Sequence, residues 1–405
     1  MARMDVQVDV LVIGAGPVGA LTAGLMAQSG LSVLVIEAGE PKILSAPASD
    51  GRAIAIALSA KRSLEIGGFW THLAPYAEPI LDIHVTDGKA PVLLHYDHRD
   101  VGKDPFGWIV ENEEIKSAAL RRLAELGIPV KSSTTVTDWQ FSAQGVSATL
   151  SDGTVISARL AVAADGRPSP TRQAAGIKTK GWDYGQSAIV CAVGHEKPHD
   201  NVAHEHFMPA GPFAILPMTG QRSGIVWTEK RSLVPAILAQ EDACFLGELS
   251  EKIGDFLGRI NLAGPRFAYP LTFQMADRTI GIRLALVGDA AHGMHPIAGQ
   301  GLNLGIRDAA ALAQVVVEGA RLGQDVGGSV VLERYQRWRR FDTGMMMSVT
   351  DGLNHLFSNR NPLLAAVRDI GLFAVEHCPP AKRLFTRHAM GVVGDLPRPL
   401  QGLPL

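Results

Sequence analysis

The sequence predicts an α/β fold with a parallel-sheet domain, a second domain built on an antiparallel sheet, and a helical C-terminal region. Three observations support this fold class. The first 36 residues read as strand, helix and strand, which is a βαβ unit and implies a parallel sheet. Residues 185–271 hold short β-like runs divided by Pro and Gly. From residue 331 onward most apolar residues recur at helical spacing.

The individual elements follow from local patterns. The short apolar runs QVDVLVI and LSVLVI are typical of buried parallel strands, and an Ala-, Leu- and Gly-rich helix lies between them. Farther along, we expect a helix over 112–126, a hairpin over 145–157, buried strands over 160–164 and 283–287, and helices over 234–259 and 301–322. The Pro-rich ending LPRPLQGLPL predicts a flexible tail over 396–405.

The composition excludes several classes of protein. A net charge of −2 gives no electrostatic reason to expect nucleic acid as a partner. The three cysteines are widely spaced, which favours neither a disulfide framework nor a zinc site and suits a reducing cytosol. No leader pattern and no apolar run of about 18 residues occurs, so the sequence predicts a cytoplasmic protein without a spanning helix.

A GxGxxG motif, GAGPVG, connects the first strand to the first helix. Gly14 permits the tight turn, Gly16 lets a pyrophosphate approach the backbone, and Gly19 lets the helix pack closely on the strand. Pro17 opens the helix, whose N-terminus faces the phosphates. Glu37 ends the second strand, at the distance from which an acid binds a ribose hydroxyl. The motif therefore predicts a dinucleotide site, and a Gly-rich turn without a ligand is the alternative.

Two later motifs favour a flavin over a nicotinamide dinucleotide. Asp165 and Gly166 follow one buried strand, and Gly288 and Asp289 follow another. An Asp at a strand end, flanked by small residues, can bind a polyol such as ribityl while the backbone stays close. Taken singly, Asp165 could be part of an ordinary Asp-Gly turn and Asp289 could be a helix N-cap.

With these motifs the chain resembles the group A flavoprotein aromatic hydroxylases, and more closely the ubiquinone-biosynthesis (UbiH/UbiF/VisC-type) hydroxylases. Their signature H-P-[LIV]-[AG]-G-Q-G-x-N-x-G-x-x-D is met at every position of HPIAGQGLNLGIRD, residues 295–308. The resemblance covers most of the chain, and it implies an FAD-binding Rossmann-like domain of the glutathione-reductase type. It also implies a division into domains. The FAD-binding domain takes 1–80, 98–182 and 272–342, the β-sheet substrate domain takes 81–97 and 183–271, a C-terminal helical region takes 343–395, and the tail takes 396–405.

The resemblance assigns roles to residues. The resemblance implies that the ADP half of FAD is held by Gly14, Gly16, Pro17, Gly19 and Glu37. It implies that Arg52 lies near the pyrophosphate and the flavin, and that Asp165 and Gly166 belong to the motif used for the FAD pyrophosphate and for the nicotinamide cofactor. It assigns the ribityl chain to Gly288 and Asp289, and the flavin N1/C2=O edge to Gly301, Leu302 and Asn303. Two alternatives stay open. Arg52 could be an ordinary surface arginine, and Asn303 could be a capping residue of its helix. No catalytic side chain is assigned, and His295 and Pro296 are only flavin-proximal candidates, since His295 could merely order its loop. His204 and His206 share a strand face, but an exposed polar strand is favoured, so no metal site is expected.

The implied reaction is hydroxylation of the aromatic ring of a polyprenyl phenol by O2 through C4a-hydroperoxyflavin, with NADPH, NADH or another electron donor as reductant. The chain has no second GxGxxG motif, which agrees with group A hydroxylases. The alternatives are another phenolic substrate, or a non-catalytic subunit of a lipid-synthesis complex. An amphipathic segment over 361–377, followed by Lys382, Arg383 and Arg387, suggests peripheral attachment to the inner face of the cytoplasmic membrane or to a biosynthetic complex. Packing of that segment on the protein's own core is the alternative.

Overall fold

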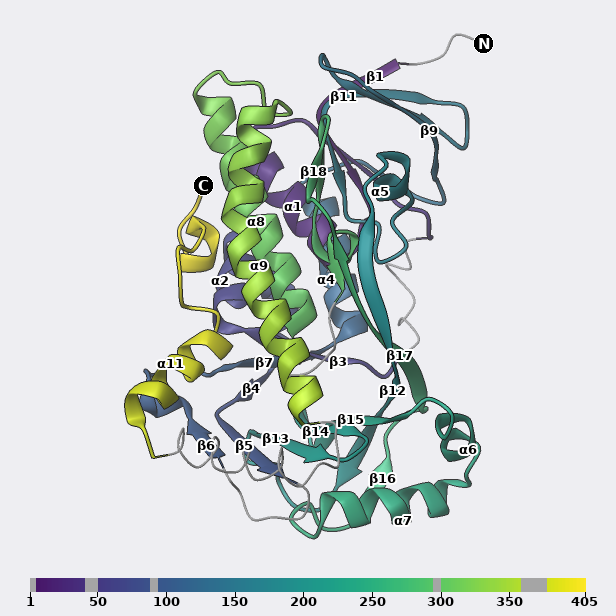
Figure 1. Ribbon diagram of the computed structural model, residues 1–405, viewed down its shortest axis with the longest axis vertical. Helices are drawn as coiled ribbons and strands as arrows, with labels where there is room; N and C mark the ends of the chain where they lie inside the picture. The colour runs from purple at the N-terminus through teal and green to yellow at the C-terminus, as the bar shows by residue number, and fades with distance from the viewer. Residues whose placement is uncertain (1–4, 41–49, 88–93, 294–299, 358–376) are drawn as a thin grey trace.

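The computed structural model describes residues 5–40, 50–87, 94–293, 300–357 and 377–405. Three sheets organise these residues (Figure 1). The first sheet has a parallel core in the order β19 (Leu284–Leu286), β11 (Val155–Ala163), β1 (Asp5–Ile13), β2 (Val33–Ile36) and β8 (Val130–Lys131). At its edges lie β18 (Ile280–Gly281) beside β19 and the hairpin of β9 (Val136–Phe141) and β10 (Val146–Leu150) beside β11.

Burial on both faces explains the apolar strands of this sheet. In β1, Val10 and Val12 face one apolar core and Leu11 faces another, and all three side chains are fully buried. The first core is covered by α1 (Pro17–Gln28), α4 (Asn112–Glu125) and α8 (Gln300–Arg321), and α9 (Ser329–Phe357) runs alongside α8 (Figure 1). The C-terminal ends of β1, β11 and β19 meet at one edge, where ligands bind in open α/β sheets.

The second sheet is antiparallel except for one parallel pair, β13 with β5. Its order is β20 (His292–Gly293), β17 (Phe267–Ala276), β12 (Thr179–His195), β15 (Arg222–Lys230), β14 (Gly211–Met218), β13 (Val202–Met208), β5 (Asp82–Asp87) and β6 (Leu94–Asp97), with β16 (Ile260–Leu262) beside β12. The helix α7 (Asp242–Ile253) packs Phe245 and Leu249 on one face, against Phe213 and Trp227. We call the opposite face, which is turned toward the rest of the molecule, the inner face (Figure 1).

A small third sheet lies between the two large ones. It consists of β3 (Ala53–Ala57), β7 (Gly107–Glu111) and β4 (Glu78–Ile80), and β3 leads directly into α2 (Leu58–Ile66) and then α3 (Trp70–Leu73). Its residue Ile109 shares an apolar cluster with Ala203 and Met218 of the inner face. The inner face is therefore packed, at one end, directly against the third sheet and the start of α2.

Two sequence predictions about secondary structure are wrong. The helix expected over 234–259 is divided into α6 (Val234–Leu238) and α7, and α7 ends at Gly254, whose φ of +81° breaks the helical backbone. The tail expected to be flexible is ordered: it contains a short 3-10 helix, Arg398–Gln401, and Leu400 is fully buried. The composition argument failed because Leu396 and Leu400 alternate with prolines and pack on the core formed by α2 and α8.

The C-terminal segment folds back onto the helices α2 and α8. After α11 (Pro379–Ala389), the backbone of Met390 accepts a hydrogen bond from Ser59 N. Farther on, Arg398 N donates to the side chain of Gln314, and Trp338 Nε1 donates to Asp395 O, both at 2.8 Å. The division into domains stays a prediction. Three of its boundaries, at 182/183, 271/272 and 342/343, fall inside the continuous elements β12, β17 and α9.

Candidate active site

The three glycines of GAGPVG serve different purposes. At Gly14 the backbone has φ +104°, and an added Cβ would lie 2.3 Å from the carbonyl oxygen of Ala164. At Gly19 an added Cβ would lie 2.1 Å from Gly14 O. At Gly16, by contrast, an added Cβ would meet nothing within 4 Å. Gly14 and Gly19 are thus required by packing, whereas the bare backbone of Gly16 opens onto space into which a ligand can fit.

The space beside Gly16 suits a negatively charged group. Gly16 is the N-cap of α1 and Pro17 is its first residue, and no side chain caps the amides of this helix start. Amides at a helix N-terminus attract anions such as a pyrophosphate. Glu37 lies at the same loop, where its carboxylate accepts hydrogen bonds from Ala15 N at 2.7 Å and from Gly39 N at 2.9 Å. Glu37 therefore lies next to the GAGPVG turn, and its role toward a ribose hydroxyl stays a prediction.

Two arginines join the loop after β11 to the loop after β19. Arg172 is buried and donates hydrogen bonds to Ala290 O at 2.8 Å and to Arg167 O at 3.0 Å. The Nε atom of Arg167 lies 3.5 Å from the Asp289 carboxylate. Sequence reasoning missed both arginines, although they belong to the motif ADGRPSPTR that carries Asp165. Charged residues just after a buried strand were the available signal.

The carboxylate of Asp165 is engaged in local structure. It accepts hydrogen bonds from Ser169 Oγ at 2.5 Å and from Thr171 N at 3.0 Å, and so holds the start of the short helix α5 (Pro170–Ala174). Gly166 follows with φ +80°, a conformation that favours glycine. These contacts are those of a residue that shapes the loop. A role of Asp165 and Gly166 toward the pyrophosphate stays a prediction, and it would fall to their backbone.

Arg52 is held in place by two neighbours, Asp50 and Tyr269. Its guanidinium pairs with Asp50 at 2.7 Å and lies over the ring of Tyr269, 5.1 Å from the ring centroid. Tyr269 Oη donates to Asp50 O at 2.8 Å. Although burial disfavours the charge, the Asp50 carboxylate holds the pKa of Arg52 above its ordinary value. Arg52 Nε is buried without a hydrogen-bond partner among the described residues, so it has a donor to offer to a ligand.

The first turn of α8 contains Gly301, Leu302 and Asn303. An added Cβ at Gly301 would meet nothing within 4 Å, so this side of the helix start is open. Asn303 is buried instead; its Oδ1 accepts from Ala57 N and its Nδ2 donates to Ala55 O, both at 2.9 Å. The side chain of Asn303 therefore ties α8 to β3, and the alternative that it caps its own helix is wrong.

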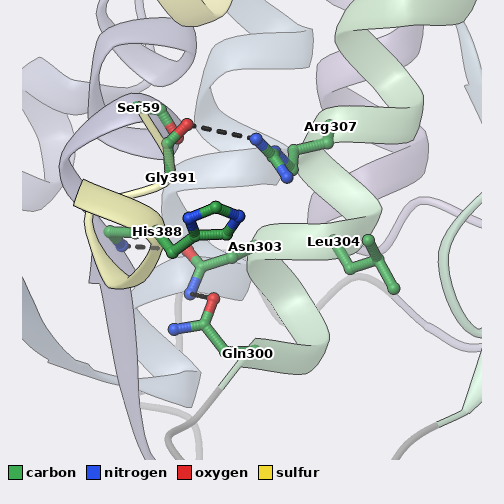
Figure 2. Close-up of a pocket in the computed structure, with 8 residues that line it drawn as sticks. Ser59, Gln300, Asn303, Leu304, Arg307, His388 and Gly391 are labelled. Carbon is green, nitrogen blue, oxygen red and sulfur yellow. Dashed lines mark hydrogen bonds between the residues drawn. The ribbon is translucent and has the colours of Figure 1, made fainter. Parts of the chain in front are cut away.

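A pocket lies where the start of α8 meets the end of α11 (Figure 2). Figure 2 shows Asn303, Leu304 and Arg307 along α8, with His388 and Gly391 facing them. Arg307 donates to Gly391 O at 3.1 Å. The C-terminal segment thus closes the wall of this pocket, although it is the part of the chain most distant in sequence from the GAGPVG loop.

A buried ionic network supports these loops from behind. Asp308, the last residue of HPIAGQGLNLGIRD, accepts hydrogen bonds from Gly288 N at 3.0 Å and from His292 Nε2 at 2.6 Å. Its other oxygen accepts from Arg339 Nε at 2.7 Å. Burial alone would raise the pKa of Asp308, but His292 and Arg339 hold that pKa below its ordinary value. Sequence reasoning did not find this network, because Arg339 comes from α9 and only the fold brings it to Asp308.

The remaining candidates divide into two groups. His295 and Pro296 lie outside the described residues. His204 and His206 point to the α7 side of β13, where His204 packs on His84 and Phe256 and His206 Nδ1 lies 2.5 Å from Thr86 Oγ1. Within the described part of the chain, no group of three or more His, Cys, Asp or Glu side chains is arranged to hold a metal ion.

A comparison with known protein families identifies the family to which this chain belongs. The model of the FAD binding domain family matches residues 7–341. The chain belongs to this family. Members and fold relatives agree with this assignment: the chain is 48% identical over 99% of its length to ubiquinone hydroxylase UbiL of Rhodospirillum rubrum, of which 94% is covered. It is 32% identical over 95% of its length to 3-demethoxyubiquinol 3-hydroxylase of Escherichia coli, of which 98% is covered.

Solved structures share the fold. The p-nitrophenol 4-monooxygenase PnpA of Pseudomonas putida superposes with a TM-score of 0.79 at 19% identity, covering 95% of this chain and 98% of PnpA. HpxO of Klebsiella pneumoniae, solved in complex with FAD, superposes with a TM-score of 0.74 at 19% identity, covering 95% of this chain and 99% of HpxO. The α/β architecture with an FAD-binding domain is thus confirmed.

FAD is the cofactor of this family member, and the described residues fit it. The open approach at Gly16 matches a pyrophosphate, the spare donor of Arg52 matches an acceptor, and the open first turn of α8 at Gly301 matches the edge of a flat ring. The assignment of single residues to parts of FAD remains our proposal.

Proposed function

We propose that this protein is an FAD-dependent monooxygenase that hydroxylates the aromatic ring of a polyprenyl phenol in ubiquinone biosynthesis. The observation that carries the proposal is the 48% identity to a ubiquinone hydroxylase, because it extends over 99% of the chain. It therefore includes the phosphate-binding loop, the stretch at the start of α8 and the antiparallel sheet together. The co-substrates are O2 and a reductant, which is NADPH, NADH or another electron donor. The sequence has no second GxGxxG motif, so it does not distinguish among these reductants.

Bound FAD supplies the activation of O2 and the transfer of one oxygen atom to the ring. The chain contributes binding and orientation. The amides at the start of α1 and the bare Gly16 would hold the phosphates, and Asp289 would accept hydrogen bonds from ribityl hydroxyls. The start of α8 would direct its positive helix end toward the flavin edge, where negative charge gathers on reduction.

The substrate side is formed by the inner face of the antiparallel sheet. Beyond the end where Ala203 and Met218 pack against the third sheet, this face carries apolar residues from several strands, including Val190, Val226 and Leu271. An apolar wall suits an aromatic ring with a prenyl tail, and it excludes water from the reacting atoms. The ring would then lie between this wall and the start of α8.

The test is an assay of purified, FAD-loaded protein with a short-chain prenyl phenol, NADH or NADPH and O2. We expect a product heavier by one oxygen atom and consumption of the reduced cofactor in step with it. Hydroxylation of simple phenols but not of prenyl phenols would instead indicate a hydroxylase with another substrate. A protein that binds no FAD would indicate a non-catalytic subunit, and either result would overturn the proposal.

We further propose that the enzyme takes this lipid-like substrate from an anionic membrane surface. No helix in the described part of the chain is long and apolar enough to cross a bilayer. The described helix α11 exposes Leu384 and Phe385, with half of each side chain accessible, next to Lys382, Arg383 and Arg387. Exposed apolar side chains flanked by basic ones suit attachment to anionic headgroups. The amphipathic segment predicted over 361–377 lies outside the described residues, apart from His377.

A further inference from the structure

One carboxylate on the inner face is unlike its surroundings. Glu205 lies in the middle of β13, with its Cα paired to Val85 of β5 and to Ala214 of β14. Paired residues on adjacent strands point to the same face, as do residues two apart along one strand. Glu205 is thus surrounded on its face by four buried apolar residues: Val85, Ala203, Phe207 and Ala214.

The face that carries Glu205 is the one turned toward the FAD-domain side. The neighbouring residues His204 and His206 pair with Ile215 and Phe213, which belong to the core under α7. Glu205 therefore points away from α7. Two residues earlier on the same face, Ala203 packs in one cluster with Leu58 and Ile109. Leu58 is the first residue of α2 and follows Ala57, to which the start of α8 is tied by Asn303.

Glu205 has no described group to neutralise it. Among the described residues its carboxylate makes no hydrogen bond or ion pair, and burial alone raises its pKa to about 7. By the same register, the other titratable groups placed on this face include Tyr96, Arg222, Tyr269 and Lys230, and tyrosines, arginines and lysines as classes ionise well above neutral pH. A lone carboxylate in an apolar wall is costly for folding, so function explains its presence more readily than stability does.

We propose that Glu205 binds the phenolic hydroxyl of the substrate and accepts its proton as oxygen is added to the ring. The O–H bond of the phenol breaks, the proton passes to the carboxylate, and the electron pair stays on the phenol oxygen and is delocalised into the ring. The ring becomes more nucleophilic at the carbon that receives oxygen. This inference rests on the proposed function, since it requires a phenol on the inner face.

The position and basicity of Glu205 suit this role. An apolar wall orients the ring but provides no partner for its hydroxyl, and a single partly buried acceptor fixes which way the ring faces. A carboxylate that ionises near pH 7 is a stronger base than an exposed one and is still partly ionised at neutral pH. Glu205 would therefore be a catalytic residue that touches the substrate.

The test compares wild type with Glu205→Gln, Glu205→Asp and the control Glu229→Gln. Glu229 lies on β15 of the same sheet but on the α7 face, because its strand neighbour Thr228 faces inward with Ala188. Two properties of the FAD-loaded proteins are measured: binding of a short-chain prenyl phenol from the change in flavin absorbance without reductant, and kcat for hydroxylation between pH 5.5 and 9.

For wild type and Glu229→Gln we expect kcat to fall as the pH decreases through about 7, because Glu205 becomes protonated. For Glu205→Gln we expect that fall to disappear and kcat at pH 8 to decrease by about 10²-fold, the size typical of losing a general base. Glu205→Asp should keep the pH-dependent fall with an intermediate kcat, and phenol binding should weaken in the Gln variant.

Wild-type kcat and an unchanged pH profile in Glu205→Gln would overturn the role of Glu205 and leave the proposed function standing. Absence of phenol binding and turnover in wild type would overturn both.

Urea unfolding checks that the variants fold. An acid whose pKa is raised in the folded state destabilises that state as the pH rises from about 4.3 toward 7. Glu205→Gln should then resist urea better than wild type at pH 8 and equally at pH 4.5, and equal resistance at both pH values would contradict a partly buried carboxylate without a neutralising partner at position 205.

Discussion

Asp308 and His292 are both almost completely buried, and His292 Nε2 lies 2.6 Å from Asp308 Oδ2. The same oxygen accepts from Gly288 N, so one carboxylate fixes both ends of the loop that presents Asp289. Asp308 ends the HPIAGQGLNLGIRD stretch, whose early residues were expected to meet the flavin. Its side chain instead holds the neighbouring loop, 16 to 20 residues earlier in the chain.

Replacing Asp308 with Asn should therefore destabilise the protein. Arg339 would lose one of its carboxylate partners in a buried site, which typically costs about 3–5 kcal/mol of unfolding free energy. The difference in unfolding free energy between this variant and wild type should shrink below about pH 4. The pKa of Asp308 is lowered in the folded protein, so its stabilising contribution is lost as the carboxylate becomes protonated. Urea unfolding of the apoprotein measures this difference. Asp104→Asn is the control, since Asp104 is exposed and its 3.5 Å pair with Arg62 contributes little; equal effects of the two changes would contradict the network.

Asp289→Ala should weaken FAD binding by roughly 1.5–3 kcal/mol, the cost typical of losing a hydrogen bond to a charged group. Asp289 is half-exposed and is paired only loosely with Arg167, so the fold should tolerate the change. Fluorescence titration of apoprotein with FAD measures the affinity. Asp277→Ala, at an exposed position after β17, should leave the affinity unchanged. Unaltered FAD affinity in Asp289→Ala would remove Asp289 from the proposed site.

Gly16→Val should yield folded protein without FAD. The new side chain would enter open space, at a backbone position with φ −62° that valine accepts, and would occupy the approach proposed for the pyrophosphate. The ratio of flavin to protein absorbance after purification measures occupancy, and circular dichroism checks the fold. Gly102→Val, also in open space, is the control and should retain FAD. Full occupancy in Gly16→Val would show that the phosphates bind elsewhere.

Leu400→Ala should lower the unfolding free energy by about 2–5 kcal/mol, as for other leucines removed from a core. Leu400 is fully buried although it lies five residues from the C-terminus. Leu403→Ala is the matched control, because 44% of that side chain is exposed, and it should change stability by less than about 0.5 kcal/mol. Thermal and urea unfolding measure both. Tolerance of Leu400→Ala would mean that the end of the chain does not contribute to the core.

Reversing the charges of Lys382, Arg383 and Arg387 to Glu should reduce binding to vesicles that contain phosphatidylglycerol, and should leave FAD content unchanged. Each basic residue near an anionic surface contributes on the order of 1 kcal/mol. Co-sedimentation with these vesicles and with neutral phosphatidylcholine vesicles measures the effect. The control reverses three exposed charges far from α11 in sequence: Lys178, Lys180 and Arg278. Equal loss in both variants, or no vesicle binding by wild type, would point to a protein partner as the source of substrate.

The local chemistry of the cofactor site follows from the sequence by itself. GAGPVG between a strand and a helix, Glu37 at the end of the next strand and the small residues around Asp289 depend on neighbours within a few residues, where spacing fixes geometry. The βαβ start and the change to short β-runs were likewise predictable, because burial on one or both faces imposes a period on the residues.

Only the tertiary structure determines which residues far apart in the sequence come into contact. Asn303 binds β3 instead of capping α8, Arg339 reaches Asp308 from another helix, and Leu400 reaches the core despite a Pro-rich context. In the sequence, Glu205 is a polar residue between two histidines. The strand register places it on the opposite face from both histidines, as a lone carboxylate among apolar side chains. The physical reason is the same in each case. Burial and pairing depend on contacts between elements far apart in the chain, and local periodicity does not contain that information.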